Sequence, residues 1–196
     1  YICFLDSDDL FEVNHLDVLH KCIIEKNKPK ELIFTNCYHL KNDILETPTI
    51  PVLENNAIEY FLLNSVIPAR VCIHESILKD FKFREDIVIV EDTVLWVTIA
   101  NKYPVWHITD YTVQYRLHDD NSVNIKNNCF LPRLQGLQKL FSEKEIAKKA
   151  GPVLLKEIIS NCYLGIAKHF EYHRFFFSMT VNLIKSFIAY PASETN

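Results

Sequence analysis

The sequence predicts an α/β fold followed by a helical segment, and three observations support this class. The chain opens with an unbroken apolar run, Tyr1–Leu5, which is typical of strands buried on both faces of a parallel sheet. Strand-like and helix-like patterns then alternate as far as Leu117. Beyond Asn127 the pattern is helical throughout. We therefore divide the chain into a first domain, 1–126, and a helical appendage, 127–196.

Apolar spacing, helix caps and Pro or Gly breaks define the expected elements in order. Strands are expected at Tyr1–Leu5, Glu31–Leu40, Pro68–Ile73 and, as one or two strands, Val105–Leu117. Helices are expected at Val13–Glu25, Ala57–Asn64, Glu75–Phe81 and Glu91 to about Lys102. The segment Lys41–Asn55 is expected to be a loop with room for a short edge strand, and Lys82–Val90 is expected to be irregular. The appendage is expected to contain helical stretches at Phe130–Ala150 and Pro152–Tyr190, the second with a break near His173.

Composition limits the class of protein. Hydrophobic residues make up 48% of the chain, enough for a core, and the net charge of −4 predicts no nucleic-acid partner. No apolar run approaches the roughly 18 residues of a membrane-spanning helix, and no signal peptide is recognisable. The six cysteines form no CxxC pair, and several lie in apolar runs, which favours reduced thiols and a cytoplasmic location.

The predicted first strand begins at Tyr1, so few residues precede it to form neighbouring strands. A central parallel strand needs neighbours on both sides. We therefore expect the chain to be the carboxyl part of a longer protein.

The apolar run ends abruptly in an acidic motif, Asp6-Ser7-Asp8-Asp9. Adjacent carboxylates repel one another, so a cation or several hydrogen-bond donors must stabilise them. In an extended segment Asp6 and Asp8 would point to one side and Asp9 to the other, and oxygen ligands of this kind suit Mg²⁺ or Mn²⁺. A capped turn, with Asp9 or Asn14 capping the next helix, explains the same residues.

Three motifs, taken together and in this order, resemble inverting nucleotide-sugar glycosyltransferases of family 2, which have the GT-A fold. They are FLDSDD at Phe4–Asp9, VEDT at Val90–Thr93 and YRLHDDNSV at Tyr115–Val123. The resemblance covers about 1–123. It implies a mixed sheet forming the carboxyl half of a Rossmann-like GT-A domain, with the half that holds the nucleotide base lying upstream.

The resemblance also implies a function. A sugar would be transferred from a nucleotide-diphosphate sugar, with a UDP-sugar as the first candidate, to a carbohydrate or lipid-linked acceptor. Bacterial surface polysaccharide synthesis is the implied pathway. The implied location is the cytoplasm, with the inner face of the membrane as a peripheral site.

The resemblance assigns metal and donor roles to five residues. Asp8 is the expected direct ligand of Mn²⁺ or Mg²⁺, with Asp6 and His118 as further ligands, and the metal would bridge the two donor phosphates. Asp6 and Asp9 would otherwise contact the donor or order the loop. Arg116 would help to hold phosphate, although a structural Tyr-Arg pair explains it equally well.

Asp92 matches the general base that the family uses on the acceptor hydroxyl. An inverting displacement needs a base on the face opposite the leaving group. Helix capping by Glu91 and Asp92 is the alternative explanation. The chain departs from the family pattern because Lys82–Val90 contains no glycine, and the chain has only 3 in total. We therefore expect a loop of different shape or an unusual acceptor pocket.

Two other classes of protein remain open. A haloacid-dehalogenase-like phosphatase also has an Asp-x-Asp motif after a strand, with Asp6 as nucleophile and Asp8 as acid/base. Here Asp9-Leu10 stands where that class has Gly-Thr. A truncated, non-catalytic scaffold domain is the alternative outside the enzymes.

The appendage carries two distinct apolar patterns. One is a stripe at helical spacing, which predicts a helical cap on the first domain: Leu154, Leu155, Ile158, Ile159, Tyr163, Ile166 and Phe170. The other puts aromatic residues on all sides of a helix over His169–Phe177, close to basic residues. Aromatic and basic residues combine in this way in interfacial helices and at dimer contacts. We therefore expect Phe175, Phe176 or Phe177 to contact a membrane or a second subunit.

Overall fold

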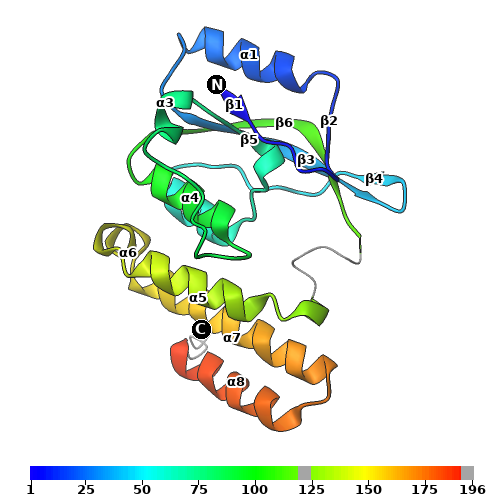
Figure 1. Cartoon of the computed structure of the whole chain (residues 1–196), viewed down its shortest axis with the longest axis vertical. Coiled ribbons are helices and arrows are strands. Elements are labelled where there is room, and N and C mark those ends of the chain that lie inside the picture. Colours follow the sequence, from blue (N-terminus) through cyan, green and yellow to red (C-terminus); the bar gives the residue numbers. More distant parts are fainter. Residues whose placement is uncertain (119–124, 191–196) are drawn as a thin grey trace. The chain divides into compact units, whose positions relative to one another are not determined.

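The computed structural model describes residues 1–118 and 125–190, and the chain divides into two compact units (Figure 1). The first unit comprises Tyr1–Phe83 and Leu95–Asp119, and the second comprises Arg84–Val94 and Asp120–Asn196. Residues 84–94, which include the Glu91-Asp92 pair, therefore belong to the same unit as the carboxyl-terminal helices. The expected domain boundary at residue 126 stays a prediction.

The first unit is built on a mixed sheet, which confirms the expected α/β class. Its strands are β1 (Ile2–Cys3), β2 (Leu10–Phe11), β3 (Leu32–Lys41), β4 (Ile44–Glu46), β5 (Val71–Ile73) and β6 (Val105–Arg116). Among the described residues their order is β1-β5-β3-β6-β2, with β4 added to the end of β3. The central strands β3 and β6 are parallel, whereas every other strand pairing among the described residues is antiparallel.

The expectation for the first strand is wrong. Instead of a central parallel strand over Tyr1–Leu5, β1 is a two-residue edge strand that pairs antiparallel with β5. Ile2 and Leu5 are 41% and 52% exposed, so the run is not buried on both faces. An apolar run without alternation does not encode which strands become its neighbours, because pairing partners lie far away in the sequence.

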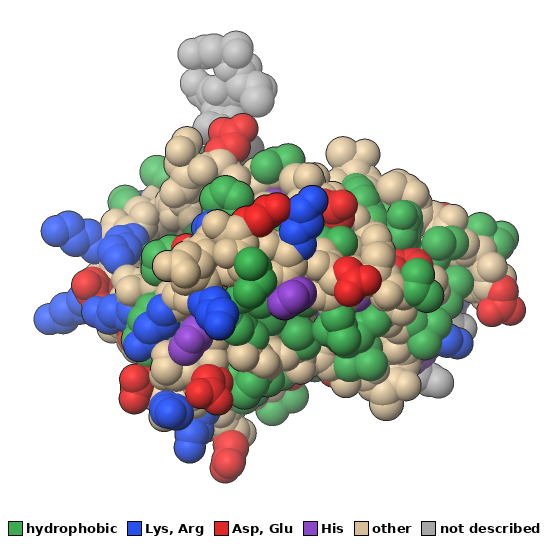
Figure 2. Space-filling view, turned by 90° about the horizontal axis from the view of Figure 1, so that it is seen from above, with side chains coloured by type: hydrophobic (Ala, Val, Ile, Leu, Met, Phe, Trp, Pro, Cys, Tyr) green, Lys and Arg blue, Asp and Glu red, His purple; other side chains and the backbone are tan. Residues whose placement is uncertain are grey.

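One face of the sheet is covered by α1 (His15–Glu25), which starts two residues later than expected. Leu19 and Ile23 of this helix pack against Ile33 of β3 and Cys72 of β5. Leu16 of the same helix remains exposed. Figure 2, seen from above the view of Figure 1, shows hydrophobic side chains between acidic and basic ones on this side.

Aromatic side chains fill the opposite face of the sheet. Phe34 of β3 contacts Tyr60 and Phe61 of α2 (Ala57–Leu63). Trp96 of α4 (Glu91–Ala100) is fully buried and donates its indole N–H to the Val66 carbonyl over 2.8 Å. A 3₁₀ turn (Pro68–Arg70) precedes β5, where a longer strand was expected, and α3 (Glu75–Leu78) is a single short turn of helix.

The second unit is helical, with α7 at its centre. A 3₁₀ turn (Ile125–Asn127) leads into α5 (Phe130–Phe141) and α6 (Lys144–Ala150), followed by α7 (Pro152–Tyr172) and α8 (Phe176–Ala189). Helices α5, α6 and α8 all pack against α7. The expected break near His173 is confirmed, and the expected helical stretch over 130–150 consists of two helices, with a break between Phe141 and Lys144. No helix in the described ranges is both long enough and apolar enough to cross a bilayer.

Candidate functional site

The acidic motif lies beside the end of β6 because β2 pairs with β6. Leu10 is opposite Gln114 in an antiparallel register, so residues that precede Leu10 lie beside residues that follow Gln114. Asp9 thereby meets Arg116 across 107 positions of sequence. The first and third predicted motifs therefore form one local structure. Residues 119–123 of the third motif lie outside the described part of the chain.

Asp9 is the buried member of the acidic motif. It is 4% exposed, and its Oδ1 accepts a hydrogen bond from the Arg116 backbone N–H over 3.0 Å. Its Oδ2 is buried without a hydrogen-bond partner among the described atoms. Burial raises the pKa of Asp9 to about 6, repulsion from Asp8 and Asp6 adds to this, and the Arg116 N–H opposes it.

Asp8 has the opposite environment. Its Oδ2 lies 3.0 Å from His118 Nε2, and both side chains are partly exposed. The Arg116 Nε donates to the Asp8 carbonyl over 3.0 Å. The hydrogen bond from His118 is the largest cause that holds the pKa of Asp8 below its usual value. Asp8 is therefore ionised at neutral pH, with the Arg116 guanidinium next to it.

The expected extended geometry of the motif is wrong. Residues 7 and 8 form a turn, closed by a hydrogen bond from the Asp9 N–H to the Asp6 carbonyl over 3.2 Å. Asp8 and Asp9 still face different partners, His118 and the Arg116 backbone. Asp6 is exposed at the start of the turn. A turn is what the alternative interpretation of Asp-Ser-Asp-Asp predicted, although the Asn14 side chain makes no capping hydrogen bond to α1.

Asp8 and His118 lie in contact, and both side chains could hold a divalent metal here. No group of three or more His, Cys, Asp or Glu side chains suited to a metal occurs in the described ranges 1–118 and 125–190. A dedicated protein cage for the ion is thus not formed by these residues. However, Mg²⁺ at nucleotide sites is commonly bound by one or two carboxylates plus substrate phosphates. An ionised Asp8 beside His118 and the Arg116 guanidinium fits that second arrangement.

A buried polar network positions the second half of β6. The sequence did not reveal this network. Asn36 sits at an irregularity in the β3–β6 pairing, and its amide donates to the Thr109 carbonyl over 2.9 Å. The His107 Nε2–H donates to Asn36 Oδ1 over 2.8 Å, and Arg70 Nε donates to the Thr35 carbonyl over 2.6 Å. Burial, and secondarily Arg70, lowers the pKa of His107 to about 4, so this imidazole is neutral. The network fixes the bulge from which β6 continues toward Arg116.

A second chain of hydrogen bonds ties α1 to the same strands. Thr112 Oγ1 donates to Thr35 Oγ1 over 2.8 Å, so it accepts from His15 Nδ1 over 2.8 Å. His15 Nε2 is then left buried without a hydrogen-bond partner among the described atoms. In the sequence, His15 lies four residues before Leu19, which places both on one face of the helix and could have indicated that His15 is buried. The same spacing also fits an ordinary core histidine.

The second unit holds Asp92, at the start of α4. Its Oδ1 accepts from the Thr93 backbone N–H, and Glu91 precedes it with a buried Oε2 that has no hydrogen-bond partner among the described atoms. Burial raises the pKa of Asp92 to about 6; Glu91 adds to the rise, and the Thr93 N–H and Arg133 oppose it. A carboxyl group with this pKa can accept a proton from a substrate near neutral pH.

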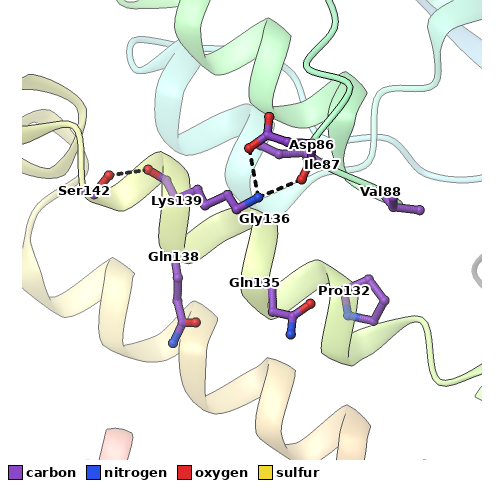
Figure 3. A pocket seen from close by; sticks show the side chains of 9 residues that line it. All are labelled: Asp86, Ile87, Val88, Pro132, Gln135, Gly136, Gln138, Lys139 and Ser142. Carbon is purple, nitrogen blue, oxygen red and sulfur yellow. Dashed lines mark hydrogen bonds and ion pairs between the residues drawn. The ribbon is translucent and has the colours of Figure 1, made fainter.

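The loop before Asp92 lines a cavity of about 850 Å³ within the second unit (Figure 3). Lys139 reaches across from α5, and its Nζ donates to the Asp86 carbonyl and carboxylate over 2.7 and 2.8 Å. Arg84, and then Lys139, hold the pKa of Asp86 well below its usual range. A Cβ on Gly136 would lie 2.6 Å from Val90, so glycine is what allows the loop to approach α5.

The same loop contains a strained residue. Ile89 has a φ of 79°, a conformation that glycine adopts easily and a β-branched residue does not. Lys82–Val90 contains no glycine, but Ile89 adopts the backbone conformation for which glycine is usually needed. Strain of this kind concentrates at functional sites.

Comparison with protein-family models found none that matches this chain, and comparison with curated proteins found no match either.

Proposed function

We propose that this chain takes part in the inverting transfer of a sugar from a nucleotide-diphosphate sugar, as the carboxyl part of a family 2 glycosyltransferase with a GT-A fold. One observation carries the proposal: the 3.0 Å contact between Asp8 and His118, which come from two motifs 110 positions apart. Independent chance matches to short motifs would have no reason to meet. A shared site for one charged ligand gives them that reason.

The residues of the first unit would bind the donor diphosphate. Asp8 and His118 would hold Mn²⁺ or Mg²⁺, which when bound neutralises charge on the departing nucleoside diphosphate. The exposed Arg116 guanidinium, beside the Asp8 carbonyl, suits a phosphate oxygen. Asp9 orients the Arg116 backbone from its buried position. The exposed carboxylate of Asp6 would contact the donor or the metal from the start of the turn.

Asp92 would act as the general base on the acceptor hydroxyl. Its raised pKa supports this role, because a base is most effective when its pKa lies near the working pH. Helix capping alone does not require a carboxyl group whose pKa is raised by burial. A carbohydrate or lipid-linked acceptor remains part of the proposal.

The phosphatase and scaffold alternatives have less support. A phosphatase would use Asp8 as a mobile acid/base, whereas here its carboxylate is engaged by His118. A non-catalytic scaffold has no need for an ionised Asp8, a neighbouring Arg116 and a buried Asp9 at one turn.

Calorimetry with Mn²⁺ and either UDP or pyrophosphate tests the donor site on the full chain. Pyrophosphate removes the nucleotide base from the test, so it reports the diphosphate site alone. We expect both ligands to need Mn²⁺, and Asp8→Asn and His118→Ala to weaken binding by at least about tenfold, the usual effect of losing a ligand or its partner. Asp80→Asn, an exposed carboxylate in the same unit, is the matched control and should bind normally. Binding that persists in excess chelator would contradict the proposal, and a chain that binds neither ligand would favour the scaffold.

A further inference from the structure

Helix α8 packs against α7 through its polar face. Asn182 is 9% exposed on this face. Ser186 donates to the Ser160 carbonyl over 2.9 Å, and Ser160 donates back to the Ser186 carbonyl over 3.0 Å. Lys185 lies over the Tyr163 ring, 5.7 Å from its centroid. Figure 1 shows α8 running alongside α7.

The opposite face of α8 is apolar and open to solvent. We define the apolar face of α8 as six large side chains that are all exposed: Phe176, Phe177, Leu183, Ile184, Phe187 and Ile188. Phe177, Ile184 and Ile188 are 83%, 55% and 72% exposed and recur at helical spacing, so they form a continuous stripe. Phe175, just before the helix, is also exposed, as expected from the sequence.

This arrangement is the reverse of the one normal for a helix of a globular protein. Such a helix buries its apolar stripe and leaves polar residues outside. Here α8 directs Ser186 and Asn182 toward α7 and exposes phenylalanine and isoleucine. Exposed apolar stripes of this size mark sites of interaction with a protein or a membrane.

We propose that the apolar face of α8 binds to the surface of a membrane that contains anionic lipids. The helix has 14 residues, about 21 Å at the usual rise, which is short of the roughly 30 Å hydrocarbon core. It therefore lies in the plane of the interface, with its apolar face among the acyl chains and headgroups. This inference does not depend on glycosyl transfer.

The charges around the helix favour anionic lipid over a second copy of the chain. Lys185 is the sole charged residue of α8. From Asn161 to Tyr190 the other charged residues are Lys168, Arg174 and a single acid, Glu171. A second copy would bring the same excess of positive charge, whereas lipid phosphates attract these basic residues.

The contact between α7 and α8 leaves the apolar face of α8 available. Ser160 and Ser186 exchange hydrogen bonds, so hydroxyl groups hold the two helices together. Such a contact holds the two helices together without burying the side chains of the apolar face of α8. Those side chains are then available for the membrane.

Vesicle co-sedimentation of the full chain tests the proposal, with vesicles of phosphatidylcholine alone or mixed with phosphatidylglycerol. We expect binding to the mixed vesicles, and a loss of at least about tenfold in the Phe177→Ser/Ile184→Ser variant, because two apolar side chains no longer enter the interface. Lys168→Gln/Lys185→Gln should weaken binding to mixed vesicles by about fivefold per lysine. It should also reduce the sensitivity of binding to salt.

The matched control is Val153→Ser, which removes a 62% exposed apolar side chain at the start of α7, away from the apolar face of α8. It should bind as the wild type does. Circular dichroism and thermal unfolding should be unchanged in every variant, because each altered side chain is exposed. Light scattering on the same samples reports the oligomeric state.

Three results would overturn the proposal. The first is a monomer that binds neither kind of vesicle. The second is a dimer that does not bind vesicles and that Phe177→Ser/Ile184→Ser dissociates, which would assign the apolar face to a second copy. The third is vesicle binding that Val153→Ser and Phe177→Ser/Ile184→Ser change equally.

Discussion

Two adjacent carboxyl groups, Asp8 and Asp9, respond in opposite ways to their surroundings. The imidazole of His118 keeps Asp8 ionised, whereas burial favours the protonated form of Asp9. A turn of the backbone is enough to separate them, because it directs one outward and the other into the protein. One residue can then hold charge for a ligand while its neighbour orders the backbone of Arg116.

The pH dependence of stability should reveal Asp9. Its pKa is about 6 in the folded chain against an ordinary 3.8, so the folded state binds this proton more tightly than the unfolded state. This contribution to stability is complete below the ordinary value and is lost as the pH rises to about 6. Asp9→Asn cannot titrate, so we expect a smaller fall in the free energy of unfolding across that range. Urea unfolding over a pH series measures it, and Asp80→Asn should retain the wild-type slope.

Cys3 should be the most reactive thiol of the chain. It lies opposite Cys72 in the β1–β5 pair and, with Cys72, lines a cavity of about 520 Å³ in the first unit. The neighbouring Cys72 thiol, with help from His15 and against burial, lowers the pKa of Cys3. Burial instead raises the pKa of Cys22 and of Cys129.

Timed alkylation with iodoacetamide, followed by mass spectrometry, tests this order. Cys3 should be labelled first, because the thiolate is the reactive form. Cys3→Ser should remove the fast phase, and Cys129→Ser should leave it intact. Faster labelling of Cys22, which is also half-buried, would show that access alone decides the rate.

At the scale of elements, close helix contacts depend on two of the 3 glycines in the chain. Gly136 of α5 admits the loop before Asp92, and Gly165 of α7 admits the ring of Phe130. A Cβ at either position would overlap a neighbouring side chain. Glycine is here a packing requirement within helices, although it lowers intrinsic helix stability.

Gly165→Ala should therefore destabilise the second unit. Alanine favours the helix by about 1 kcal/mol, but overpacking against the Phe130 ring costs about 1–3 kcal/mol. The expected net effect is a lower free energy of unfolding, measured by urea or thermal unfolding. Asn161→Ala, at an exposed position of the same helix, is the control and should be neutral or slightly stabilising. An increase in stability for Gly165→Ala would mean that the ring moves aside freely.

At the scale of the whole molecule, the proposed chemistry is divided between the two units. The residues that we propose to bind the diphosphate belong to the first unit, and Asp92 belongs to the second. The chain passes between them at residues 83–84, 94–95 and 119–120. Binding and turnover should consequently respond to different substitutions.

Asp92→Asn should separate the two functions. Roughly a hundredfold or greater loss of turnover is expected from removing a general base, with little change in Mn²⁺-dependent UDP binding. His118→Ala should instead weaken Mn²⁺-dependent UDP binding. Wild-type turnover should fall as the pH drops below about 6, because Asp92 is then protonated. Calorimetry and a transfer or donor-hydrolysis assay provide the measurements, and a loss of binding in Asp92→Asn would reverse the assigned roles.

Local patterns in the sequence determined most of the helices and the two long strands. Apolar spacing predicted α1, α2 and α4, the break near His173, and the strands β3 and β6 within a few residues. The exposed phenylalanines before and within α8 also followed from sequence, because a helix cannot bury aromatic residues on every side. These features depend on neighbours within one or two turns, which is the range over which periodicity carries information.

Tertiary structure alone decided the edge position of β1, the burial of Asp9 and the reversed orientation of α8. Each of these depends on residues distant in sequence: β1 on its pairing with β5, Asp9 on the backbone of Arg116, and α8 on the serine contact with α7. The same holds for the 3.0 Å contact of Asp8 with His118, which exists because β2 pairs with β6. Strand pairing and burial are set by the whole fold, so no local pattern specifies them.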